Sequence, residues 1–107
     1  MYVAMNRFRV AKGREAAFEA LWTGRKSHLQ EVPGFRAFHL LRGETREDHT
    51  LYASHSVWES EAAFRAWTRS EAFREAHRDA GGSGDLYLEA PVFEGFAAVE
   101  GAETVAE

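Results

Sequence analysis

The sequence contains no cysteine, and this absence removes several kinds of chemistry together. A chain without thiols has no disulfides, no thiolate nucleophile, and no iron–sulfur cluster or cysteine-ligated zinc. The absence also fits a reducing compartment, so we expect a cytoplasmic protein.

Long hydrophobic runs and an excess of positive charge are missing too. No apolar run approaches the roughly 20 residues that a helix needs to cross a bilayer. The first ten residues lack the basic and then apolar pattern of a signal peptide. The net charge is −4 and no basic stripe is present, which argues against binding to nucleic acid. We therefore expect neither a nucleic-acid nor a membrane partner.

Common catalytic motifs are likewise absent, including the phosphate-binding loop, the glycine-rich dinucleotide motif, the nucleophile elbow and the zinc-protease helix. Four histidines follow no metal-binding spacing. We interpret them as a helix-end residue, two packed or interface residues and one solvated residue: His28, His39, His55 and His49, respectively. The carboxylates at positions 15, 19, 59 and 61 are expected to face water and to complement helix dipoles.

What is present indicates one compact domain over residues 1–100, followed by a flexible tail over residues 101–107. Alternating apolar residues predict strands over 2–10, 36–43, 50–58 and 91–99. Helical spacing predicts one helix over 14–29 and a pair of helices that begin after Ser60 and Ser70. The order βαββαβ is that of a ferredoxin-like α+β fold, in which both helices cover one face of a four-stranded antiparallel sheet. The other face keeps apolar side chains, which favours a sheet-on-sheet homodimer.

The stretch over residues 58–77 carries the densest pattern in the chain. Phe64, Trp67 and His77 span roughly 140° of helix surface if the two helices are nearly collinear. Taken singly, each candidate residue has an ordinary interpretation. Asn6 fits a hydrogen-bonded strand residue, Trp67 a core residue, and His77 a partner of the helix dipole.

Together with its surroundings, the pattern resembles that of the IsdG-type heme-degrading monooxygenases. The shared run is W-x-S-x-x-A-F-x-x-W-x-x-S-x-x-F-x-x-A-H over residues 58–77. These enzymes form dimeric α+β barrels and belong to the superfamily of antibiotic-biosynthesis-monooxygenase (ABM) domains. Asn6 in the first strand and the segments 33–35 and 38–42 extend the resemblance over most of the chain. The first half of the run is common across the superfamily, whereas the Asn, Trp and His set is specific.

The resemblance implies that heme b is both substrate and cofactor, and that O₂ and an external electron donor open its ring and release iron. The donor is a reductase or a small-molecule reductant. His77 matches the axial ligand of the heme iron, Asn6 the donor to the iron-bound oxygen species, and Trp67 the residue that distorts the porphyrin.

Further roles follow from the same resemblance. Phe64 and Phe73 belong to the aromatic face that contacts the porphyrin. Arg25 takes a subordinate role beside a propionate or behind the contacting residues. The glycine-rich segment 79–85 is expected to let the porphyrin enter and leave.

Two alternatives stay open on the sequence alone. One is a cofactor-independent ABM-type monooxygenase that acts on a phenolic or quinol substrate and needs no histidine at position 77. The other is a non-catalytic heme-binding protein that uses His77 without opening the ring.

Overall fold

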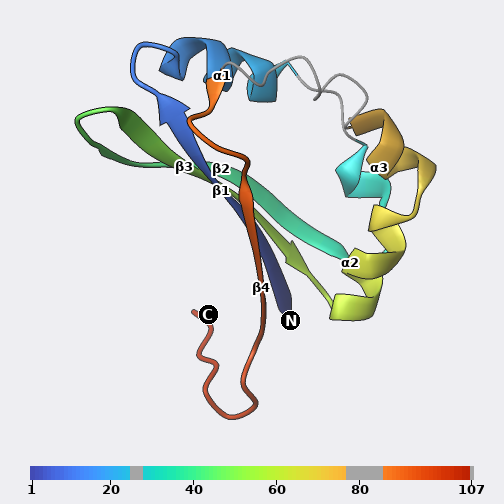
Figure 1. The fold of residues 1–107 in the computed structure, drawn as a ribbon. Coiled ribbons are helices and arrows are strands. Elements are labelled where there is room, and N and C mark those ends of the chain that lie inside the picture. The colour runs from blue at the N-terminus through green and yellow to red at the C-terminus, as the bar shows by residue number, and fades with distance from the viewer. Residues whose placement is uncertain (25–27, 77–85, 107) are drawn as a thin grey trace.

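The computed structural model describes residues 1–24, 28–76 and 86–106. Its elements run along the chain in the order β1 (Tyr2–Ala11), α1 (Glu15–Thr23), the 3₁₀ helix η1 (Leu29–Glu31), β2 (Phe35–Thr45), β3 (His49–Trp58), α2 (Glu61–Thr68), α3 (Glu71–Ala76) and β4 (Val92–Ala97). The four strands form one antiparallel sheet in the order β2-β3-β1-β4. This arrangement confirms the predicted ferredoxin-like fold, and Figure 1 shows α1 near one end of the strands and α2 with α3 towards the other.

Strict alternation along β1 decides which side chains meet the helices. Tyr2, Ala4, Phe8 and Val10 are buried, and each of them points to the face that α1 and α2 cover. The register continues this face across β3, with Trp58 opposite Tyr2 and Tyr52 opposite Phe8. Because side chains alternate with a period of two, the odd-numbered residues of β1 point to the face without helices.

That second face keeps exposed apolar side chains. Leu41, Val92 and Phe96 are 43%, 52% and 51% exposed there, on β2 and β4. His39 and His55 lie directly opposite each other on the same face, with ring centroids 6.0 Å apart.

Helix α1 is shorter than predicted, because it ends at Thr23 rather than near residue 29. Gly24 follows at the C-cap, and its backbone N–H donates to the carbonyl of Ala20 at 3.0 Å. Glycine is the least favourable helix residue after proline, so the apolar stripe alone does not extend the helix past it. His28 therefore lies outside α1, next to η1, and its interpretation as a helix-end residue of α1 is wrong.

The predicted caps of α2 and α3 are confirmed. The hydroxyl of Ser60 accepts a hydrogen bond from the Ala63 backbone N–H at 3.1 Å. The hydroxyl of Ser70 donates to the Trp67 carbonyl at 2.6 Å and accepts from the Phe73 N–H at 3.2 Å. Ser70 thus joins the last turn of α2 to the first turn of α3 and sets the direction in which the chain continues.

The turn before β2 packs closely on α2. Gly34 has a φ of +84°, and a Cβ built there would lie 2.4 Å from the Cβ of Ala63. Its carbonyl accepts a hydrogen bond from the Glu59 N–H at 2.7 Å. Only glycine fits both the left-handed conformation and the close approach, which fixes the start of α2 against the sheet.

Helix α1 is held on the sheet by carboxylates that were predicted to face water. Glu19 accepts hydrogen bonds from the Tyr52 hydroxyl and from Arg42, at 3.0 Å from Nε and 3.1 Å from Nη2. Glu15 accepts from the Thr50 hydroxyl at 2.8 Å. The pKa of Glu19 is lowered mainly by the Tyr52 hydroxyl, and the pKa of Glu15 by its own backbone N–H and then by Thr50. Glu15 lies in the first turn of α1, as the dipole argument predicted. The contacts to Thr50 and Tyr52 were missed because both partners come from β3, which is distant in sequence.

His49 was also predicted to be solvated, and this is wrong. The residue is 5% exposed, and its Nδ1 lies 2.7 Å from the Asp48 carboxylate, whose pKa the hydrogen bond lowers. It pairs with Ala11 at the end of β1, so the sheet rather than solvent surrounds it.

The carboxylate of Glu19 makes stability depend on pH. Because its folded-state pKa lies below the unfolded value, its contribution is present above about pH 4.3 and is lost as the pH falls through the folded-state pKa. We expect Glu19→Gln to lower the free energy of unfolding at pH 7 and to weaken its dependence on pH below that. Tyr52→Phe keeps the ring and removes the donor, so it should weaken the dependence in the same direction. Urea denaturation at a series of pH values tests this, and an unchanged slope in both variants would contradict it.

Candidate functional site

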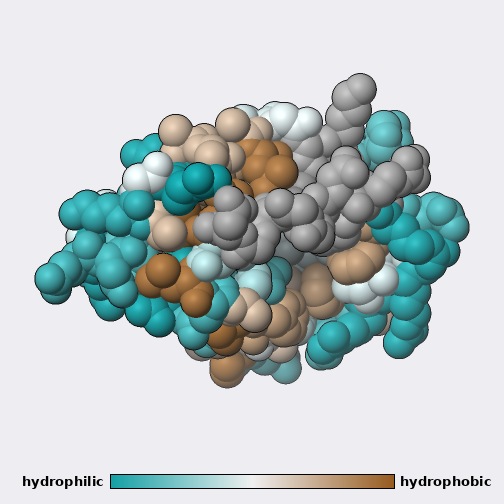
Figure 2. All heavy atoms as spheres, turned by 45° about the horizontal axis from the view of Figure 1, so that its top comes forward, coloured by the Kyte–Doolittle hydropathy of each residue, from teal (hydrophilic) through white to brown (hydrophobic). Residues whose placement is uncertain are grey.

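A cavity of about 800 Å³ lies between the covered face of the sheet and the helices. Every major element contributes to its lining, which consists of Ala4, Asn6, Phe8, Trp22, Leu29, Phe38, Ser54, Ser56, Phe64, Arg65, Trp67, Thr68, Phe73, Tyr87, Pro91 and Phe93. Figure 2 shows hydrophobic surface gathered in the middle of the visible face, with hydrophilic surface at its two ends. Most of the residues that line the cavity are therefore apolar.

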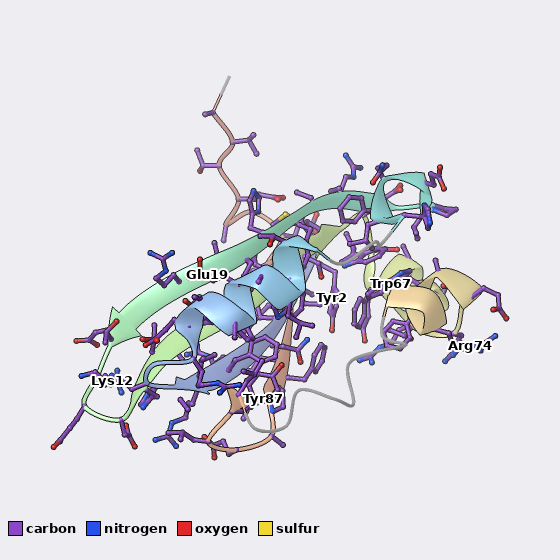
Figure 3. All side chains as sticks on the ribbon, turned by 90° about the horizontal axis from the view of Figure 1, so that it is seen from above. Tyr2, Lys12, Glu19, Trp67, Arg74 and Tyr87 are labelled. Atoms are coloured by element: carbon purple, nitrogen blue, oxygen red, sulfur yellow. The ribbon has the colours of Figure 1, made fainter. Side chains whose placement is uncertain are left out.

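Aromatic rings from α2 and α3 form one wall of the cavity. The rings of Trp67 and Phe73 meet edge to face, with centroids 4.8 Å apart and an interplanar angle of 84°. Phe64 stacks on Phe93 of β4 at 5.8 Å and 9°. Trp67 points from α2 towards the space between the helices in Figure 3, and its ring rests on the buried Trp58 at 5.2 Å. The buried Trp58 ring therefore holds the Trp67 side of this wall in place.

The opposite wall comes from α1 and the segment before β4. Trp22 stacks on Phe38 at 5.8 Å and 13°, and meets Phe8 edge-on at 5.6 Å. Tyr87 lies against Phe8 at 5.5 Å and forms a bridge with Val10 of β1. Figure 3 shows Tyr87 at the end of the sheet nearer α1, well separated from Trp67.

Three polar side chains line the floor of the cavity, namely Asn6 from β1 and Ser54 and Ser56 from β3. Asn6 and Ser54 are direct partners in the β1–β3 register, so their side chains leave the sheet together. Ser56 is already engaged, since its hydroxyl donates to the Ala4 carbonyl at 3.3 Å and accepts from Trp58 Nε1 at 2.9 Å. Within the described ranges, the side chains of Asn6 and the 5% exposed Ser54 form no hydrogen bond. Both are available to a ligand.

Arg65 is the sole charged residue among the described residues that line the cavity. Its guanidinium carbon lies 5.5 Å from the centroid of the Phe64 ring, and its Nε and Nη2 each lie 3.3 Å from one oxygen of Glu61. The side chain is 48% exposed, so the positive charge stands at the rim.

Four of the six predicted site residues meet at this cavity: Asn6, Phe64, Trp67 and Phe73. The other two, His77 and Arg25, and the predicted entrance over residues 79–85 lie outside the described residues. In sequence, His77 directly follows the last residue of α3. In the described part of the chain, no three His, Cys, Asp or Glu side chains come together as a metal site.

Sequence reasoning missed Ser54 and Arg65, whereas Tyr87 was considered either as a ligand contact or as a cover for the core. The alternation of β3 placed Ser54 on the same face as Trp58, and its register opposite Asn6 would have identified it. Arg65 forms an i,i+4 pair with Glu61, which looks like an ordinary solvated pair until the position of Phe64 is known.

The two serines of the floor should differ in their effect on stability. Ser54→Ala removes a hydroxyl without a partner, so we expect the free energy of unfolding to change by no more than about 0.5 kcal/mol. Ser56→Ala removes the acceptor of the buried Trp58 Nε1 and should cost about 1–3 kcal/mol. Both substitutions share a strand, a face and a side chain, so each controls for the other in urea denaturation. Equal losses in the free energy of unfolding would show that the Ser54 hydroxyl contributes to stability and is not available to a ligand.

The chain is similar to several known proteins. Two staphylococcal relatives are named staphylobilin-producing heme oxygenase. The one from Staphylococcus saprophyticus is 32% identical over 72% of this chain and 73% of its own, and the one from Staphylococcus haemolyticus is 35% identical over 74% and 75%. The structure of the heme degrader MhuD from Mycobacterium tuberculosis, which has two hemes in its active site, superposes with a TM-score of 0.70 at 28% identity over 92% of this chain and 96% of that one.

These relatives confirm the resemblance to the IsdG-type heme-degrading monooxygenases. No helix in the described part of the chain is long and apolar enough to cross a membrane. The sequence profile of the antibiotic biosynthesis monooxygenase family matches residues 1–79. The chain therefore belongs to the antibiotic biosynthesis monooxygenase family, and its two staphylococcal relatives are named as enzymes.

Proposed function

We propose that this protein is a heme-degrading monooxygenase whose substrate, heme b, binds in the cavity between the sheet and α1, α2 and α3. The observation that carries the proposal is an aromatic-walled cavity with the free amide of Asn6 on its floor and the chain towards His77 leaving from its wall. The staphylobilin-producing heme oxygenases and the heme-bound MhuD support the choice of substrate.

The residues present fit a porphyrin. A volume of about 800 Å³ lies within the range of roughly 300–1,000 Å³ typical of small-molecule sites. The cavity has two aromatic walls, one centred on Trp67 and the other on Trp22, and both suit a flat apolar molecule. The charge of Arg65 lies at the rim. A planar ligand with polar groups at one edge matches this distribution.

Each residue then has a separate task. His77 would hold the heme iron through a neutral imidazole. The Asn6 amide would donate a hydrogen bond to O₂ in the cavity without supplying an acidic proton, because an amide N–H is not acidic at neutral pH. Trp67, whose ring packs on Trp58, would contact the porphyrin and favour a distorted ring. Phe64 and Phe73 exclude water from the same wall.

Bound heme supplies the redox chemistry by which O₂ and an external reductant open the ring and release iron.

The protein is also expected to act as a homodimer. The exposed apolar side chains of the helix-free face, among them Leu41, Val92 and Phe96, are covered by a second copy in a homodimer. We place the dimer in the cytoplasm, and assign residues 1–100 to a single domain.

Heme binding is tested by titration followed in the visible spectrum. Wild type should show a saturable Soret shift. His77→Ala should lower the affinity for heme by about 100-fold or more, because the loss of a group that only orients a metal ligand already lowers metal affinity about 10–100-fold. His28→Ala is the matched control, because His28 is an exposed histidine outside the cavity lining, and it should bind like wild type.

The other outcomes decide between the alternatives. Specific binding that does not depend on His77 would contradict the assigned ligand. No specific heme binding in wild type would contradict the proposal and favour the cofactor-independent oxidation of a phenolic or quinol substrate in the same cavity.

A further inference from the structure

The described residues that line the cavity carry a net positive charge. Among its described residues stands one cation, Arg65 of α2, and no carboxylate. The remaining polar groups are all neutral, namely the amide and hydroxyls of the floor, the hydroxyls of Thr68 and Tyr87, and the indole N–H groups of Trp22 and Trp67. The electrostatic potential inside such a lining favours an apolar ligand that carries a carboxylate at its edge.

The contacts of Arg65 leave it able to bind such a group. Its Nε and Nη2 share a single carboxylate oxygen of Glu61, Oε2, at 3.3 Å each, which is long for an N–H···O hydrogen bond. A guanidinium has five N–H donors in a planar fork, so most of its donors stay open to a second acceptor. Its position beside the Phe64 ring, 5.5 Å from the centroid, keeps the group at the edge of the aromatic wall.

We propose that Arg65 is a specificity-determining residue that binds a propionate carboxylate of the porphyrin at the rim of the cavity, with Glu61 as an intramolecular competitor for the same guanidinium. This inference rests on the proposed function, because it assumes a porphyrin in the cavity. It assigns to α2 a second task beside its aromatic wall, namely the choice of which edge of the ligand faces solvent.

The test uses metal-free protoporphyrin IX, which removes any contribution of an axial ligand, and a neutral porphyrin whose two carboxylates are converted to soluble glycol amides. Quenching of tryptophan fluorescence reports binding, because Trp22 and Trp67 line the cavity. Arg65→Gln should weaken binding of the dicarboxylate roughly three- to tenfold and leave the affinity for the neutral porphyrin unchanged. Glu61→Gln frees the guanidinium and should strengthen binding of the dicarboxylate about twofold.

Arg74→Gln is the matched control. Arg74 forms a similar helical ion pair with Glu71 at 2.8 Å, but it points away from the cavity, as Figure 3 shows, and it does not line it. It should leave both affinities unchanged.

Three results would overturn the inference. An Arg65→Gln variant that binds the dicarboxylate as tightly as wild type, or that loses affinity equally for both porphyrins, would contradict a carboxylate contact while leaving the proposed function in place. A wild-type protein that binds neither porphyrin nor heme would overturn the inference and the proposed function together.

Discussion

The site depends on one buried indole, that of Trp58 at the end of β3. The side chain is fully buried and touches the entrance of β2 through Phe35 at 5.5 Å, and α2 through Phe64 at 5.7 Å and Trp67 at 5.2 Å. Its Nε1 donates to Ser56 on the cavity floor, so its one polar atom is satisfied inside the core. A single ring thereby sets the distance between the sheet and the wall that carries Trp67, and this distance determines whether a planar molecule fits.

The two faces of the sheet have different roles because of the two-residue period of β1. One face gathers the large aromatic side chains beneath the helices and leaves Asn6 as the polar position between Ala4 and Phe8. The other carries the apolar side chains that a second copy would cover. Small domains of this size bury little surface alone, so a shared sheet interface and an aromatic core are both ways to add stability.

Much of the fold followed from local pattern. Alternation gave the faces of the strands, and Ser60 and Ser70 marked the starts of α2 and α3, because both signals depend only on neighbouring residues. The end of α1 was missed because Gly24 outweighed the apolar stripe. The roles of Glu19 and His49 were missed because their surroundings come from distant strands. In the site, the motif located Asn6 and Trp67, but the availability of Ser54 and the rim position of Arg65 required the three-dimensional register.

We propose that the protein converts heme into an open-chain product rather than storing it. The most direct measurement is the mass of the tetrapyrrole recovered after the heme-loaded protein meets ascorbate, and separately a second electron donor, in air. We expect loss of heme, an iron-free product with added oxygen and an equivalent of iron captured by a chelator. Recovery of intact heme with both donors, despite saturable binding, would contradict catalysis and show that the protein is a heme carrier or sensor.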